Sequence, residues 1–146
     1  MRISVIHGPN LNLLGVREPD VYGRVTLAEI DRRIDELAAE LGVEVTCVQH
    51  NCEGAIIDAI QQAGCNADGI VINPAGYTHT SVAIHDALKA VVIPAIEVHL
   101  SNILAREEWR HRSMTALACE GVIGGLGVDS YLLALRGIVA LGEAGS

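Results

Sequence analysis

Short apolar runs and amphipathic stretches alternate along the chain about five times. The apolar runs are rich in β-branched residues and too short for helices, which predicts β-strands at residues 3–6, 43–48, 69–72, 91–96 and 122–123. Between them, apolar residues recur at helical spacing, which predicts helices at residues 27–41, 53–63, 81–90 and 129–141. Thr26 and Glu29 form a capping box at the start of the first helix, and Gly42 ends it.

Alternating strands and helices with short connections predict a parallel sheet with right-handed crossovers. Five strands suit a flavodoxin-like α/β three-layer sandwich with strand order 2-1-3-4-5, in which ligands bind beyond the carboxyl ends of the strands. No internal repeat or linker interrupts residues 1–146, so we expect a single domain. Only residues 8–24 break the rhythm, and a connection of this length is typical of a binding loop or lid.

Composition narrows the function. Half of the residues are hydrophobic but only 3% are aromatic, so the core must be built from aliphatic side chains. A formal net charge of -8 argues against a nucleic-acid partner, although a local arginine cluster could still hold an anionic substrate. We find no signal-peptide pattern and no apolar run near the roughly 20 residues of a membrane span, so we expect a cytoplasmic protein.

Polar and ionisable residues collect after three of the predicted strands. They are Asn10, Asn12, Arg17, Glu18 and Tyr22 after the first, Asn73, Tyr77, Thr78, His79 and Ser81 after the third, and Glu97, His99, Ser101, Asn102, Arg106 and Arg110 after the fourth. Because the carboxyl ends of parallel strands meet at one edge of a sheet, the three clusters predict one shared site.

Each cluster also has a purely structural interpretation. Asn10 and Asn73 could cap helices or form Asx turns. Arg106 and Arg110 could each form a solvated ion pair with a nearby acidic residue on one face of a helical segment. It is the coincidence of three clusters at one edge that favours a functional site.

Metal binding is not expected at this edge. Glu97, His79 and His99 lack an HExxH or comparable ligand spacing. His7 and two other histidines, His50 and His111, are interpreted as structural or surface residues. The four cysteines have no CxxC spacing and read as reduced thiols.

Five sequence blocks resemble the signatures of type II 3-dehydroquinate dehydratases. They are GPNLNLLG from Gly8, REPDVYG from Arg17, NPAGYTHTSVAIHDAL from Asn73, IEVHLSNILAREEWRHRS from Ile96 and GVIGGLGVDSYLLAL from Gly121. The resemblance spans residues 3–135. It implies a hydro-lyase of the shikimate pathway or quinate breakdown, which would convert 3-dehydroquinate to 3-dehydroshikimate by anti elimination of water through an enolate. It also implies a homododecamer built as a tetramer of trimers.

The resemblance also assigns roles to individual residues. Tyr22 matches the proton-abstracting base, Arg17 the lid arginine beside it, and His99 the donor of a proton to the departing hydroxyl. Substrate-binding positions match Asn73, His79, Leu100, Ser101 and Arg110, and supporting positions match Asn10, Glu97 and Arg106. Asp86 matches an acidic residue that reaches the site of an adjacent subunit.

These roles agree with elementary chemistry. A guanidinium close to Tyr22 would lower the pKa of its phenol from about 10, and Glu97 could orient or polarise His99. No metal or cofactor is needed, and an imine mechanism is not favoured because Lys89, the only lysine, lies in a predicted helix away from the rim.

Some positions differ from the family pattern. The order Ala75-Gly76 replaces the commoner Gly-Ala, Trp109 stands where Phe is frequent, and His85 stands where Arg is frequent; His50 and Cys52 also depart. Two alternatives stay open: a flavodoxin-like module that binds FMN, which the scarcity of aromatic rings disfavours, and a homologue retained only as a structural oligomer.

Overall fold

The structure, a computed structural model, describes residues 1–16 and 18–145. Five parallel strands form one sheet in the order β2-β1-β3-β4-β5. The strands are β1 (Arg2–His7), β2 (Glu44–Gln49), β3 (Gly69–Asn73), β4 (Ala95–His99) and β5 (Gly121–Gly124). The helices are α1 (Pro19–Tyr22), α2 (Leu27–Leu41), α3 (Glu53–Asn66), α4 (Val82–Ala90) and α5 (Val128–Ala144). The predicted fold class and strand order are confirmed.

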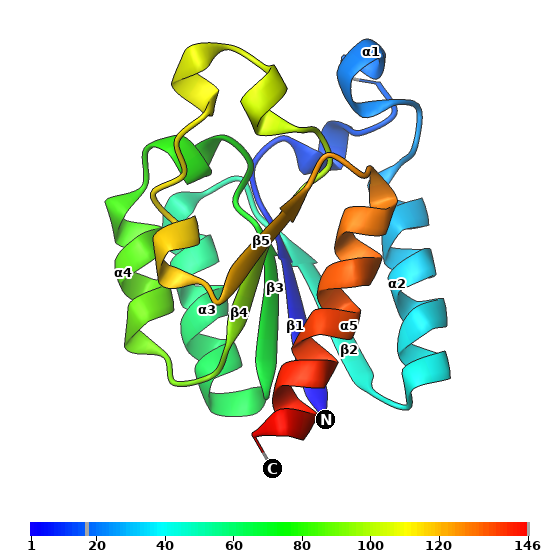
Figure 1. The fold of residues 1–146 in the computed structure, drawn as a ribbon, viewed down its shortest axis with the longest axis vertical. Helices are drawn as coiled ribbons and strands as arrows, with labels where there is room; N and C mark the ends of the chain where they lie inside the picture. The colour runs from blue at the N-terminus through cyan, green and yellow to red at the C-terminus, as the bar shows by residue number, and fades with distance from the viewer. Residues whose placement is uncertain (17, 146) are drawn as a thin grey trace.

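Helices cover the sheet on both faces, which gives three layers (Figure 1). Helices α2 and α5 pack on one face around the fully buried Ile30, Ile34 and Ile138. Helices α3 and α4 pack on the other around Ile60 and Ile84. All five residues of β3 and of β4 are buried, so these strands depend on aliphatic contacts from both sides.

Most element ends lie within one residue of the prediction, and local signals account for several of them. Thr26 caps α2 by accepting a hydrogen bond from the Glu29 backbone N–H at 3.2 Å, and Gly42 ends the helix at φ 70°. The prediction for the fourth strand, residues 91–96, was wrong at both ends, since the strand is Ala95–His99. The strand begins at Ala95, because Pro94 has no N–H to donate, and Val92 is fully exposed.

The connection from β1 to α2 is not one long loop. It contains the 3-10 turn η1 (Leu11–Leu13) and the four-residue helix α1, which the sequence analysis did not predict. The segment after β4 likewise forms two separate 3-10 turns, η3 (Ile103–Ala105) and η4 (Glu108–Arg110), so the proposed helical face shared by Arg106 and Arg110 does not exist.

Close backbone approach shapes the functional edge of the sheet. A Cβ on Gly8 would lie 2.7 Å from the Pro74 carbonyl carbon, so only glycine allows the ends of β1 and β3 to meet there. A Cβ on Gly124 would contact the His99 side chain at 3.3 Å, so glycine in β5 allows close packing against β4. In the described part of the chain, no helix is both long and apolar enough to cross a membrane.

Candidate active site

A pocket of about 260 Å³ lies beyond the carboxyl ends of the strands. Three stretches that are distant in sequence contribute to its wall, as the polar clusters predicted. It is lined by Pro9, Asn10, Leu11, Asn73, Ala75, Gly76, His79, His99, Leu100, Ser101, Ile103, Arg106, Trp109 and Arg110. The charged and polar side chains in its wall suit a small polar ligand.

His99, the last residue of β4, forms part of the pocket wall, and Glu97 lies behind it. Strand residues two apart face the same side, which places Glu97 and His99 together. The His99 Nε2 is 2.8 Å from Glu97 Oε2 and 3.5 Å from the Thr78 hydroxyl. A carboxylate can only accept, so Nε2 carries a hydrogen, and Nδ1 is the ring nitrogen left for a ligand.

Glu97 is fully buried yet held ionised. Burial opposes the charge, but hydrogen bonds from His99, Thr115 and Ser113 outweigh it and hold the pKa of the carboxyl below its ordinary value. Ser113 donates at 2.8 Å, and the Thr115 hydroxyl donates to the other carboxylate oxygen. The pocket therefore has a fixed negative charge behind its histidine.

Two asparagines also line the pocket: Asn10 has a constrained backbone, and Asn73 has a constrained side chain. Asn10 adopts the left-handed conformation (φ 68°), and its N–H donates to Asn51 at 3.0 Å. Asn73 ends β3; its Oδ1 accepts from the Ala75 N–H and its Nδ2 donates to the Tyr131 hydroxyl, both at 3.0 Å. Ala75 itself has a φ of 51°, where an L-residue is strained.

The cationic side of the pocket is built around Trp109. The Arg110 guanidinium lies 4.1 Å from the Trp109 ring centroid, and Arg110 Nε is 2.6 Å from Glu107. The His79 ring meets the same Trp109 edge-on, and its Nδ1 lies 2.8 Å from the Arg112 carbonyl oxygen. Trp109, which stands where Phe is frequent, thus contacts two predicted binding residues, Arg110 and His79.

The remaining predicted residues divide into three groups. Leu100, Ser101 and Arg106 line the pocket, with Arg106 Nη2 3.9 Å from Glu18. Arg17 lies outside the described residues, and for Tyr22 the structure describes only the backbone, as the last residue of α1. Asp86 lies on the exposed side of α4, hydrogen-bonded to His85, and does not line the pocket.

Sequence reasoning missed the residues that support the site from behind. Ser113 and Thr115 follow a run of surface turns, and nothing in their spacing points to Glu97. Tyr131 was assigned to a helix without a role, although its hydroxyl holds Asn73. A lone tyrosine in an aliphatic core, whose hydroxyl must find a partner, was the available signal.

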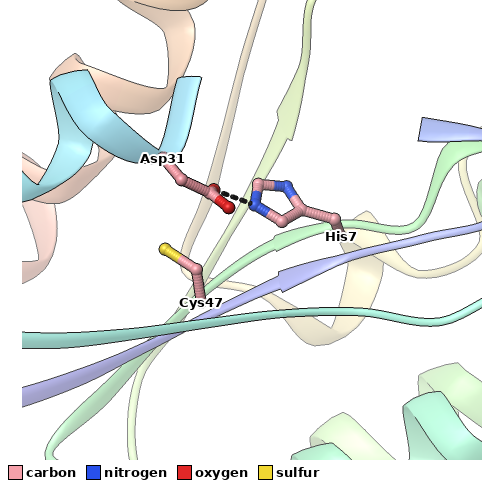
Figure 2. Close-up of side chains that lie close together, drawn as sticks. All are labelled: His7, Asp31 and Cys47. Carbon is pink, nitrogen blue, oxygen red and sulfur yellow. Dashed lines mark hydrogen bonds and ion pairs between the residues drawn. The ribbon is translucent and has the colours of Figure 1, made fainter. Parts of the chain in front are cut away.

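A second cluster of ionisable side chains, from β1, α2 and β2, lies outside the residues that line the pocket. His7, Asp31 and Cys47 have ligand atoms within 4.8 Å of one another, and this is the one group of potential metal ligands found among the described residues. It does not include His79, His99 or Glu97, the residues considered for zinc from the sequence. In Figure 2 the Asp31 carboxylate points at the His7 ring, and the two are hydrogen-bonded at 2.7 Å.

Together, the fold and this pocket define a flavodoxin-like α/β protein with a carboxylate-backed histidine at the ligand-binding edge of its sheet. The family model described as "Dehydroquinase class II" matches residues 1–139. The chain belongs to the class II dehydroquinase family.

Individual relatives agree with this assignment along nearly the whole chain. A 3-dehydroquinate dehydratase of Pelotomaculum thermopropionicum is 55% identical over 141 residues, covering 97% of this chain and 98% of the relative. That of Gloeothece citriformis is 59% identical and covers 94% and 90%. Among solved structures, the type II dehydroquinase from Butyrivibrio crossotus superimposes with a TM-score of 0.93 at 50% identity, covering 94% of this chain and 97% of that one.

Proposed function

We propose that this pocket removes water from 3-dehydroquinate by proton abstraction, formation of an enolate and anti expulsion of hydroxide, giving 3-dehydroshikimate. As a member of its family the chain is a lyase, a type II 3-dehydroquinate dehydratase of the shikimate pathway. The observation that carries the mechanism is the contact between His99, on the pocket wall, and the buried Glu97 carboxylate, 2.8 Å away.

His99 acts as the general acid in this proposal. Expelling hydroxide from an enolate is slow unless the oxygen receives a proton. Because Glu97 holds Nε2–H, the proton is delivered from Nδ1, and the ring must start as an imidazolium. The buried negative charge of Glu97 stabilises that cation in a medium where charges interact strongly.

Tyr22 acts as the base and Arg17 as its activating partner. This part rests on the resemblance of the REPDVYG block, in which the arginine precedes the tyrosine by five residues. A tyrosine works as a base only as phenolate, and a guanidinium within a few ångströms favours phenolate by roughly 1–3 pKa units.

Substrate groups find suitable partners on the pocket wall. We assign the substrate carboxylate to Ser101 and the backbone around Leu100, and the ring hydroxyls to Asn73, His79 and Arg110, which all line the same pocket. Asn10 and Arg106 complete the wall as supporting residues, and we assign to Asn10 the role of holding a water at the enolate oxygen. Residues 1–146 act as a single domain in this proposal, without metal or cofactor.

We further propose a cytoplasmic homododecamer, a tetramer of trimers. The resemblance supports this assembly, and so does the position of Asp86, whose exposed side chain lies away from its own pocket and is available to a neighbouring subunit. Native mass spectrometry measures the number of chains directly. If the carboxylate completes a neighbour's site, Asp86→Asn should lower kcat/KM and leave the number of chains in the assembly unchanged.

The first experiment is to mix the purified protein with 3-dehydroquinate and follow the ultraviolet absorbance of the conjugated enone, with and without EDTA. We expect the band to grow equally in both samples. A flat trace from a well-folded oligomer would contradict the activity, a yellow preparation would indicate the FMN-binding alternative, and a loss with EDTA would contradict the metal-free mechanism.

The second experiment tests the base. Tyr22→Phe should lower kcat by at least about 10²-fold, the typical worth of a positioned general base. Tyr77→Phe is the matched control, because its hydroxyl bonds to the Asn51 carbonyl oxygen at 2.9 Å and Tyr77 does not line the pocket. Arg17→Ala should shift the pH profile of kcat to higher pH, and an unchanged profile would show that the phenol is activated in another way.

A further inference from the structure

A continuous chain of hydrogen bonds links the half-buried Asp31 on α2 to the pocket residue Asn73. The Asp31 carboxylate is 2.7 Å from His7 Nε2, and His7 Nδ1 is 2.9 Å from the Tyr131 hydroxyl. The same hydroxyl is 3.0 Å from Asn73 Nδ2. His7 and Tyr131 are fully buried, so water does not compete for these contacts.

The chemistry of its two ends fixes the direction of this chain. The Asp31 carboxylate can only accept, so His7 carries its hydrogen on Nε2, and Nδ1 accepts from the Tyr131 hydroxyl. The Tyr131 oxygen then accepts from Asn73 Nδ2. At the far end the Ala75 N–H can only donate, so it requires the Asn73 oxygen rather than its nitrogen.

The neutral states of Tyr131 and Cys47 preserve the donor-to-acceptor direction of this chain. Burial raises the pKa of the Tyr131 phenol far above its ordinary value, against the Asn73 hydrogen bond and aided by the Asp31 charge, so the phenol stays a donor. Burial, the Asp31 charge and a hydrogen bond to Asp31 likewise raise the pKa of the Cys47 thiol. The thiol beside Asp31 in Figure 2 is therefore a neutral neighbour of the carboxylate rather than a competing anion.

We infer that Asp31, acting through His7 and Tyr131, sets which end of the Asn73 amide faces the pocket. With Asp31 present, one Nδ2 hydrogen goes to Tyr131 and the second remains for a substrate oxygen. If His7 carried its hydrogen on Nδ1 instead, Tyr131 would have to donate to Asn73. The amide would then turn over, leaving its nitrogen against the Ala75 N–H and its oxygen in place of the donor.

These three residues are positioning residues, and their role rests on the proposed function of Asn73 in binding substrate. The decisive variant is Asp31→Asn, because a carboxylate only accepts, whereas an asparagine amide can either accept from Nε2–H or donate to Nε2, so His7 is no longer held in one tautomer. Asp35→Asn is the matched control: it removes the same charge one turn further along α2, on the exposed surface and near the same Cys47. Asp31→Glu is the conservative variant that keeps the carboxylate.

Two readouts separate positioning from general damage. Solid-state NMR of protein labelled with ¹⁵N-histidine, with His7→Asn to assign the signal, reports which ring nitrogen carries the hydrogen. We expect Nε2–H alone in the wild type, Asp35→Asn and Asp31→Glu, and a detectable share of Nδ1–H in Asp31→Asn. Steady-state kinetics should show KM for 3-dehydroquinate raised in Asp31→Asn, by up to the roughly 10-fold of a lost directional hydrogen bond, with a smaller change in kcat.

Tyr131→Phe gives an independent test should Asp31→Asn fold poorly. It removes the acceptor of Asn73 Nδ2 without changing any charge, so KM should rise in the same direction while His7 keeps Nε2–H. Unchanged KM in both variants, or an unchanged His7 tautomer in a folded Asp31→Asn protein, would overturn the inference. The NMR result does not depend on turnover, so an inactive wild type would count against the proposed function and leave the tautomer test valid.

Discussion

Two carboxylate–histidine pairs flank the same sheet edge and differ in which partner is sealed from solvent. In the Glu97–His99 pair the carboxylate is fully buried and the histidine, 7% exposed, lines the pocket. In the Asp31–His7 pair the histidine is fully buried and the carboxylate is 34% exposed. The hydrogen bonds are nearly equal, 2.8 and 2.7 Å, so geometry at the contact does not distinguish them.

Access to the ligand distinguishes the two pairs. His99 lines the pocket and uses Nε2 for Glu97, so in our proposal Nδ1 exchanges a proton with substrate while Glu97 stabilises the charged ring. Both ring nitrogens of His7 are hydrogen-bonded to protein groups, so His7 can influence the pocket only through which nitrogen carries the hydrogen. In these proposals the same pair of residue types serves proton transfer in one place and orientation in the other.

The largest difference should appear when each histidine is replaced by asparagine. His99→Asn removes the proposed acid, and kcat should fall by about 10²–10⁴-fold, the usual worth of acid–base catalysis. His7→Asn leaves the acid intact, so kcat should fall less than about 10-fold, with the main loss in KM. Initial rates from the enone absorbance measure both. Equal losses of kcat would show that the two pairs do not divide the work in this way.

A smaller effect is expected from neutralising the buried carboxylate. Glu97→Gln keeps the size of the side chain but removes the charge that favours the imidazolium, and we expect kcat to fall roughly 10–10²-fold. Glu108→Gln makes the same change on the exposed surface and should leave kcat within experimental error. If Glu97→Gln keeps wild-type kcat, the carboxylate contributes only to folding.

Stability should depend on pH through Glu97 in a defined direction. Hydrogen bonds hold its folded pKa below the ordinary value of 4.5, so its ionised form stabilises the fold above that pH, and this contribution is lost as pH falls through the folded pKa. Urea unfolding of wild type and Glu97→Gln should therefore give a constant difference in free energy near neutral pH. The wild type should lose its higher free energy of unfolding only below about pH 4.5. A gap that narrows as pH rises would contradict the assignment.

The sequence predicted the sheet and the pocket wall well because both follow from strand periodicity. Parallel strands carry their polar ends to one edge, so Asn73, His99 and Arg110 could be grouped without knowing any contact. The supporting network could not be predicted in the same way. Tyr131 lies 58 residues from Asn73 and 124 from His7, and only tertiary packing brings its hydroxyl between them. His7 was interpreted as structural or surface, and the structure shows it fully buried between Asp31 and Tyr131.

The smallest expected effect concerns the anchor of the Asn73 amide. Ala75 has a φ of 51°, a conformation that costs an L-residue roughly 1–2 kcal/mol, and the family's commoner order would put glycine there. Glycine relieves this strain but loses about 0.5–1 kcal/mol to chain entropy. Ala75→Gly should therefore raise the free energy of unfolding by up to about 1 kcal/mol, with KM nearly unchanged because the N–H that holds Asn73 remains.

Ala83→Gly is the control for this last change, because it makes the same substitution on the exposed side of helix α4. There the strain term is missing, and glycine should cost about 0.5–1 kcal/mol of stability. Urea unfolding of the two variants gives the comparison. Equal destabilisation would mean that Ala75 stores no strain, whereas a stabilised Ala75→Gly with a raised KM would mean that a rigid backbone at this position, as well as Tyr131, holds the Asn73 amide toward the pocket.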